Sequence, residues 1–80
     1  MRNVYLIRST AHPERTYVGI TDDIKRRLRD HNSGDSPHTS KYRPWKLVAA
    51  VAFTDDDRAA AFEQYLKSGS GRAFAAKHFW

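Results

Sequence analysis

Two short segments near the start of the chain constrain the possible fold more than any other feature. Residues 3–7 read Asn-Val-Tyr-Leu-Ile and residues 16–20 read Thr-Tyr-Val-Gly-Ile, and both compositions are typical of strands. Residues 9–15 are mostly polar and include Pro13, which favours a loop. Because a parallel connection needs about a dozen residues or more, the two strands are predicted to form an antiparallel hairpin.

Alternation of side chains along these strands decides which residues share a face. In the second strand Tyr17 and Gly19 point to one face, opposite Val18. Tyr5 lies on the same face as Tyr17 if the numbers of paired residues sum to an even value, and a slip of one residue would separate the two tyrosines. The sequence permits the even register but does not fix it.

A helix is expected directly after the hairpin. The hydroxyl and carboxylates of residues 21–23 are suitable helix caps, so a helix is predicted over residues 23–31. Ile24 and Leu28 are four residues apart and would form its buried seam. Gly34 is a natural point for the chain to leave the helix.

The second half of the chain supplies a third strand and a second helix. Residues 35–44 are polar and contain two prolines, which indicates a loop. The apolar residues 46–53 are predicted to form a third, central strand. Three aspartates at 55–57 would cap the second helix, whose buried stripe consists of Ala59, Phe62 and Leu66.

The last predicted element is a short helix over residues 72–79. The Ser-Gly-Ser-Gly stretch at 68–71 is expected to break the preceding helix, and Phe74 would pack back onto the sheet, with Phe79 or Trp80 as further contacts. The resulting order is β-β-α-β-α-α. This is an α+β fold, with a small three-stranded antiparallel sheet flanked by helices, and residues 1–80 are expected to form a single domain.

Composition limits the classes of function. The chain has no cysteine, which excludes disulfides and thiolate metal sites, and no apolar run approaches the roughly 20 residues that span a bilayer. The N-terminal apolar stretch is too short for a signal peptide, so a cytoplasmic protein without membrane association is expected. Lys and Arg number 14 against nine Asp and Glu, and this net charge of +5 favours a nucleic-acid partner.

Several side chains could act on a phosphodiester bond, which requires a proton acceptor, positive charge on the phosphate and usually a metal. Tyr5, Tyr17 and His31 can transfer protons. Arg27 lies four residues before His31, on the same side of the predicted helix, and its rigid guanidinium suits a phosphate. Glu63, on the shoulder of the second helix, can hold a hard divalent cation.

Each of these residues also has a plainer interpretation. A strand tyrosine is usually part of a core, and His31 could simply suit the C-terminal end of its helix. Arg27 could pair with Asp23, and Glu63 with Lys67, because each pair is four residues apart. Gly19 would allow a phosphate to approach the strand, although a β-bulge would explain it equally well.

The motifs taken together resemble those of the GIY-YIG nuclease family, in particular its short stand-alone bacterial members. The similarity covers essentially the whole chain. It rests on Tyr-Val-Gly-Ile-Thr at 17–21, Arg-Leu-Arg-Asp-His-Asn at 27–32 and Pro-Trp-Lys-Leu-Val at 44–48. It also includes Tyr5 in the first strand and a lone helical glutamate, Glu63.

This resemblance implies DNA hydrolysis with one Mg²⁺ or Mn²⁺ ion. It assigns Tyr17 to activation of the attacking water, with Tyr5 hydrogen-bonded in the same site. It assigns Arg27 to the scissile phosphate, His31 to proton transfer, and Glu63 to the metal as its single protein ligand. DNA phosphates are expected to contact exposed groups around the site, namely Gly19, Lys25, Arg26, Lys41 and Arg43.

The sequence departs from the family in two places. The first tripeptide, usually Gly-Ile-Tyr, is Asn-Val-Tyr at residues 3–5, and no asparagine follows Glu63. The sequence therefore supports two functions, a structure-selective or weakly selective DNA endonuclease in repair or processing, or a nucleic-acid-binding module of the same fold with weak or no catalysis. In either case a partner protein could supply specificity.

Overall fold

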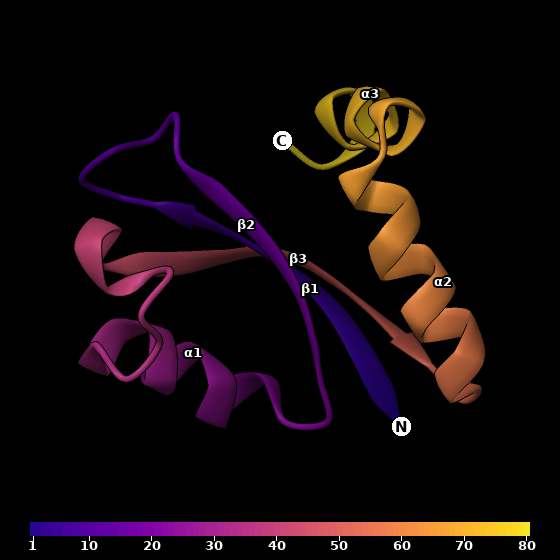
Figure 1. Cartoon of the computed structure of the whole chain (residues 1–80), viewed down its shortest axis with the longest axis horizontal. Coiled ribbons are helices and arrows are strands. Elements are labelled where there is room, and N and C mark those ends of the chain that lie inside the picture. The colour runs from indigo at the N-terminus through magenta and orange to yellow at the C-terminus, as the bar shows by residue number, and fades with distance from the viewer.

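A three-stranded antiparallel sheet forms the middle layer of the protein (Figure 1). A computed structural model describes residues 1–80. Strand β1 spans Arg2–Ser9 and β2 spans Thr16–Thr21, and together they form the predicted hairpin. Strand β3, Trp45–Phe53, pairs antiparallel with the other side of β1. The order across the sheet is β2-β1-β3, which confirms the predicted fold class.

The central strand is β1, so the prediction of a central β3 is wrong. Four consecutive β1 residues, from Val4 to Ile7, are buried, because this strand is covered on both faces and paired on both edges. In β3 only Trp45 is buried, and Leu47 is exposed. The run of residues 46–53 is apolar mainly through valine and alanine, and small alanines gain little from a central position.

The hairpin has the even register. Tyr5 lies opposite Gly19 and Ile7 lies opposite Tyr17, so the two tyrosines share one face of the sheet. Pairing between β1 and β2 is continuous, whereas the pairing of β1 with β3 shifts by one residue between Leu6 and Ile7. The irregularity therefore lies on the β3 side and leaves the β2 strand regular around Gly19.

Helix α1, Ile24–Ser33, covers the face of the sheet that carries the tyrosines. The Asp23 side chain accepts a hydrogen bond from the Arg26 amide at its N-terminus, and Gly34 ends it with φ of 89°. The expected seam is incomplete, because Ile24 and Leu28 are only half-buried. The only buried residue of α1 is His31.

Helices α2, Asp56–Lys67, and α3, Gly69–His78, cover the opposite face (Figure 1). The expected glycine-rich break at 68–71 is a single residue, Ser68, which ends α2 and begins α3. Its hydroxyl oxygen accepts a hydrogen bond from the Gly71 amide at 3.2 Å. A Cβ atom at Gly71 would collide with the Tyr65 carbonyl oxygen, so this glycine lets α3 pack closely on α2.

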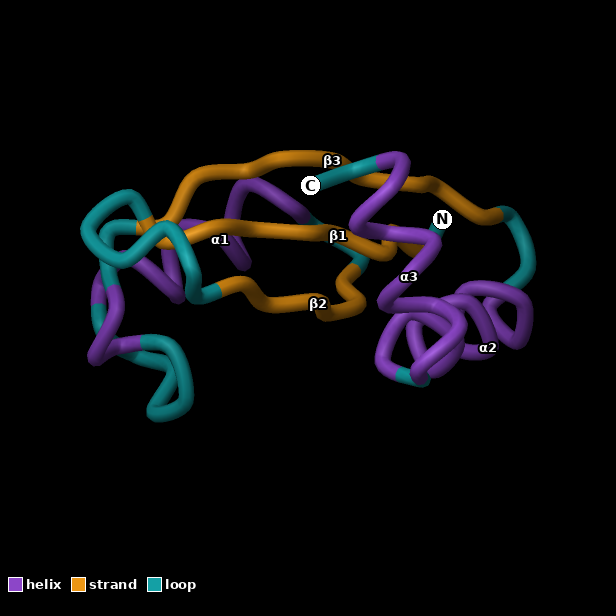
Figure 2. Tube along the Cα trace, turned by 90° about the horizontal axis from the view of Figure 1, so that it is seen from above, coloured by secondary structure: helices purple, strands orange, loops and turns teal.

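The two longer loops, residues 10–15 and 34–44, lie together at one end of the sheet (Figure 2). The Thr10 amide donates a hydrogen bond to the Pro44 carbonyl at 2.9 Å, and the Ser9 hydroxyl donates to the Tyr42 carbonyl at 2.6 Å. The longer loop contains a short 3₁₀ turn at Ser40–Tyr42. None of the three helices has the length and apolar character needed to cross a bilayer.

Candidate active site

The site is built on the face shared by Tyr5 and Tyr17. Their ring centroids are 6.3 Å apart, and Tyr5 is buried whereas Tyr17 is only half-buried. Gly19 lies directly opposite Tyr5 on the neighbouring strand, and a Cβ atom there would collide with the Tyr5 hydroxyl and ring. The glycine thus makes room for the Tyr5 ring, and no bulge is needed to explain it.

His31 connects α1 to this face from a completely buried position. Its Nε2 atom is 2.8 Å from the Tyr5 hydroxyl, and its ring centroid is 5.1 Å from that of Tyr17. The other ring nitrogen, Nδ1, is 2.6 Å from the Thr39 hydroxyl. Burial lowers the pKa of His31, and the positive charge of Arg27 lowers it further, so the imidazole is neutral at physiological pH.

Thr39 and Trp45 complete this buried group, and neither was expected from the sequence. Thr39 is 1% exposed, and its carbonyl accepts a hydrogen bond from the Trp45 indole N–H at 2.8 Å. The Asn32 side chain holds the Trp45 backbone, because its amide donates to the Trp45 carbonyl at 3.0 Å. A loop rich in polar residues gives no periodic signal for burial. The one available clue is that a buried histidine needs a partner for each ring nitrogen.

Arg27 approaches Tyr5 from the preceding turn of α1. Its hydrogen bond with Tyr5 raises the pKa of Arg27, and burial partly opposes this rise. Burial raises the pKa of Tyr5, whereas the same hydrogen bond with Arg27 lowers it. The guanidinium also lies 3.8 Å from the Asp30 carboxylate. The alternative pairing with Asp23 is not formed, because Asp23 caps the helix.

Glu63 lies on α2, which packs on the other side of the sheet. It is 8% exposed, and its negative charge contributes to the raised pKa of Tyr5. One carboxylate oxygen forms an ion pair with Lys67, and the other accepts a hydrogen bond from Gln64 at 3.3 Å. The plainer interpretation of Glu63, a pair with Lys67, is therefore realised in the structure.

The donor set at Glu63 fits one kind of divalent site. No group of three or more His, Asp or Glu side chains gathers anywhere in the chain, so a cage made only of protein ligands is absent. Mg²⁺ prefers oxygen ligands and keeps most of its waters, so a single protein carboxylate is compatible with it. The Lys67 ammonium already forms an ion pair with this carboxylate, so a metal ion would have to compete with Lys67 for it.

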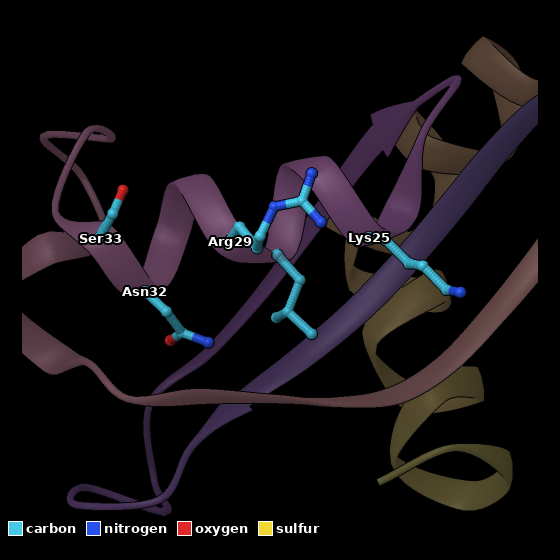
Figure 3. Close-up of a pocket in the computed structure, with 5 residues that line it drawn as sticks. Lys25, Arg29, Asn32 and Ser33 are labelled. Atoms are coloured by element: carbon cyan, nitrogen blue, oxygen red, sulfur yellow. The ribbon is translucent and has the colours of Figure 1, made fainter.

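The remaining expected phosphate contacts lie outside this cluster. Lys25 lines a cleft along α1 with Arg29, Asn32 and Ser33 (Figure 3), and Arg26 pairs with Asp22 at 3.2 Å. Lys41 and Arg43 lie in the longer loop. Lys41 lies over the Tyr42 ring, and Arg43 covers Gly34 at the end of α1. The structure therefore brings together Tyr5, Tyr17, Arg27 and His31, whereas Glu63 lies on α2, where its charge contributes to the raised pKa of Tyr5.

These features define a class of protein. The family model for the GIY-YIG catalytic domain matches residues 1–76, and the chain belongs to this family. Among curated proteins, the structure-specific endonuclease subunit SLX1 of Candida dubliniensis is 39% identical over 82 residues, which cover 94% of this chain and 27% of that protein. SLX1 of Debaryomyces hansenii is 38% identical over 71 residues, covering 80% of this chain and 20% of that protein.

The chain spans about a quarter or less of the length of these relatives. A solved structure shows the same fold over a larger share of both chains. The solution structure of a UPF0213 protein from Bacillus halodurans matches with a TM-score of 0.56 and 28% identity, covering 96% of this chain and 84% of that one.

Proposed function

We propose that residues 1–80 act as one catalytic domain that hydrolyses DNA phosphodiester bonds as a divalent-metal-dependent, structure-selective endonuclease. The observation that carries this proposal is the convergence of Tyr5, Tyr17, Arg27 and His31 on one face, in a chain whose residues 1–76 match the GIY-YIG catalytic domain. The SLX1 relatives are named structure-specific endonuclease subunits, which supports both a preference for DNA structure and a protein partner that supplies specificity.

Tyr17 and His31 differ in burial, and this difference indicates different roles for them. Tyr17 is half-buried, so its hydroxyl is the group best able to contact and orient an attacking water. His31 is completely buried and both ring nitrogens are engaged, so it cannot contact the substrate. Its part in proton transfer therefore runs through the Tyr5 hydroxyl, which it positions.

Two charged side chains have different roles at the phosphate: Arg27 would neutralise its negative charge, and Glu63 would hold the metal ion. The Arg27 guanidinium is partly exposed beside Tyr5, where it can neutralise a phosphoryl oxygen as negative charge develops. Glu63 would hold Mg²⁺ or Mn²⁺ through one carboxylate. Such an ion supplies Lewis acidity to phosphate oxygens and lowers the pKa of a bound water.

The proposal is tested by incubating the purified protein with branched, nicked, flapped and single-stranded DNA in Mg²⁺ or Mn²⁺. The variants Glu63→Gln and Tyr17→Phe each remove one reacting group with little change of shape, and Glu14→Gln is a control at an exposed loop carboxylate. We expect cleavage by the wild type and by Glu14→Gln, and a loss of about 10²-fold or more in both site variants. Equal cleavage by all four proteins would contradict the assignment.

A second candidate function is a nucleic-acid-binding module without catalysis. The ion pair between Glu63 and Lys67, together with the absence of an asparagine after Glu63, favours it. It predicts saturable binding to DNA with no metal-dependent cleavage of any of these substrates. A titration of Mn²⁺ by electron paramagnetic resonance separates the two functions, because only the nuclease requires an ion at Glu63.

A further inference from the structure

We propose that a cleft at the free edge of β2 holds the DNA backbone next to the scissile bond, and that Arg72 of α3 is its main phosphate contact. This inference rests on the proposed function and adds a substrate-binding subsite to it. The cleft has a volume of about 460 Å³ and lies between β2 and the junction of α2 with α3. Tyr17, Lys67 and Arg72 are among its lining residues.

The position of the cleft connects it to both halves of the candidate site. Tyr17 forms one wall, and the same residue lies against His31 on the tyrosine face. Lys67 forms another wall and pairs with Glu63. A strand whose scissile phosphate lies beside Arg27 and Tyr17 therefore passes directly into this cleft with its neighbouring phosphates.

The chemistry of the lining suits a phosphate backbone. Two cationic side chains line the cleft, and no Asp or Glu does. Arg72 is exposed and forms no ion pair or hydrogen bond through its guanidinium, unlike Arg26 and Arg27, which have carboxylates nearby. An unpaired arginine can give two parallel hydrogen bonds to one phosphate without first losing a protein partner.

The local backbone fixes where Arg72 stands. It lies in the first turns of α3, directly after Gly71, whose lack of a side chain lets the helix contact the Tyr65 carbonyl. The Ser68 hydroxyl caps the same turn through the Gly71 amide. Arg72 is thus presented by a rigid helix, which reduces the conformational entropy lost on binding.

The other cleft of the molecule is also basic but lies in the wrong place. It is lined by α1 residues that include Lys25 and Arg29 (Figure 3). Arg29 follows Arg27 by two positions, which is roughly 200° around a helix at about 100° per residue. A strand in that cleft would lie on the side of α1 away from Arg27, so the β2 cleft is the better continuation of the site.

The test measures binding without cleavage. Fluorescence anisotropy with a labelled branched DNA in EDTA compares the wild type with Arg72→Ala, with Lys77→Ala as a control on the same helix and Arg29→Ala as the test of the other cleft. We expect Arg72→Ala to bind roughly ten-fold more weakly and to reduce the log–log salt slope by about one. The two other variants should bind like the wild type.

The outcomes separate this inference from the proposed function. Wild-type affinity for Arg72→Ala overturns the subsite, and a loss confined to Arg29→Ala transfers it to the α1 cleft. Arg72-dependent binding without cleavage in any metal leaves the subsite standing while the nuclease proposal fails. Circular dichroism of Arg72→Ala, an exposed substitution, checks that its fold is unchanged.

A different observation supports a second inference, that Thr39 is a positioning residue for Tyr5. The Thr39 hydroxyl is buried, and its one hydrogen-bond partner is His31 Nδ1. Nδ1 is the one acceptor within hydrogen-bond distance of this buried hydroxyl, so we infer that Thr39 donates to Nδ1. The neutral imidazole then carries its proton on Nε2 and donates it to the Tyr5 oxygen.

This tautomer makes the Tyr5 oxygen the acceptor of the His31 Nε2 proton, so the hydrogen of the Tyr5 hydroxyl points away from His31. Thr39 therefore sets the direction of the proton on Tyr5 without touching the substrate. The histidine tautomer is the quantity to measure, because a merely structural role for Thr39 would not change it.

The ¹⁵N chemical shifts of the His31 imidazole distinguish the two tautomers directly. We expect protonated Nε2 in the wild type and in Thr39→Ser, and a shift toward protonated Nδ1 in Thr39→Val, which keeps the shape but lacks the hydroxyl. Cleavage should fall about ten-fold in kcat for Thr39→Val, with KM unchanged, and Thr39→Ser should restore it. Protonated Nδ1 in the wild type, or identical spectra for all three proteins, would overturn the assignment.

Discussion

The two faces of the sheet have opposite kinds of core. Toward α2 and α3 the buried residues are apolar, with Val4, Leu6 and Leu66 at the centre. Toward α1 the buried cluster joins Tyr5 to His31, and both are hydrogen-bonded. Strand β1 supplies both faces by simple alternation. One face therefore contributes most of the apolar burial that stabilises the fold, and the other holds a polar group in fixed positions.

The largest expected effect on stability comes from the apolar face. Leu6→Ala should lower the free energy of unfolding by about 2–5 kcal/mol, because it leaves a cavity at a completely buried position. Urea denaturation measures the change. The ¹⁵N signals of His31 in the remaining folded protein should be unchanged, and their alteration would show that the two faces are not independent.

Tyr5→Phe is the matched substitution on the polar face. We expect kcat to fall by about 10²-fold or more, because the hydroxyl that contacts His31 and Arg27 is lost. The stability loss should be smaller, about 1–3 kcal/mol for a buried donor left without its acceptor. If Tyr5→Phe retains full cleavage, the polar face has no catalytic role.

Gly19→Ala tests the close contact between β2 and Tyr5. The added methyl group would collide with the Tyr5 ring, so a loss of about 1–3 kcal/mol in stability is expected, together with reduced cleavage. Gly69→Ala is the control, because a Cβ atom there meets nothing within 4 Å. Its stability should stay the same or rise by up to about 1 kcal/mol. Equal behaviour of the two variants would contradict the steric explanation.

The buried histidine predicts a pH dependence. Burial lowers the pKa of His31 in the folded chain below its ordinary value of 6.5. At a pH between the lowered pKa and 6.5, the unfolded chain therefore binds a proton at this residue and the folded chain does not. Stability is therefore fully present above pH 6.5 and falls as the pH drops through this window. An NMR titration should show that the His31 ring is mostly neutral at pH 6.5. A ring that becomes protonated at or above pH 6.5 would contradict this prediction.

The smallest expected effect concerns the ion pair on α2. Lys67→Met removes the ammonium that competes for the Glu63 carboxylate, so Mn²⁺ should bind several-fold more tightly in the absence of DNA. Gln64→Leu is the control, since its amide makes only a long, neutral contact with the other oxygen at 3.3 Å. Weaker Mn²⁺ binding in Lys67→Met would show that Glu63 needs the lysine to hold its orientation.

The sequence was informative where local rules decide the structure. Alternation and loop length predicted the hairpin, whereas the even register that places Tyr5 with Tyr17 was permitted by the sequence but not fixed by it. The capping residues at 21–23 and 55–57 predicted where α1 and α2 begin, and the structure uses Asp23 and Asp55 as the caps. The order of the strands could not be predicted in the same way, because an apolar segment such as residues 46–53 is compatible with either a central or an edge strand.

Residues that depend on contacts between distant segments were beyond such rules. Thr39 is buried only because the 35–44 loop folds back over His31, eight residues earlier, and a polar loop carries no periodic pattern. Ser68 serves two helices at once, so residues 68–71 read as a break although the glycines belong to α3. Arg72 was visible in the sequence, but only the packing of α3 on α2 places it beside Tyr17.

The complete burial of His31 has a practical consequence for chemical modification. A reagent that carbethoxylates accessible imidazoles will reach His12, His38 and His78, which are all exposed, and leave His31 untouched. Resistance of cleavage to such a reagent would therefore not show that the protein works without a histidine. Modification that appears only after partial denaturation would report the opening of the α1 face, with His31 as a built-in probe of its integrity.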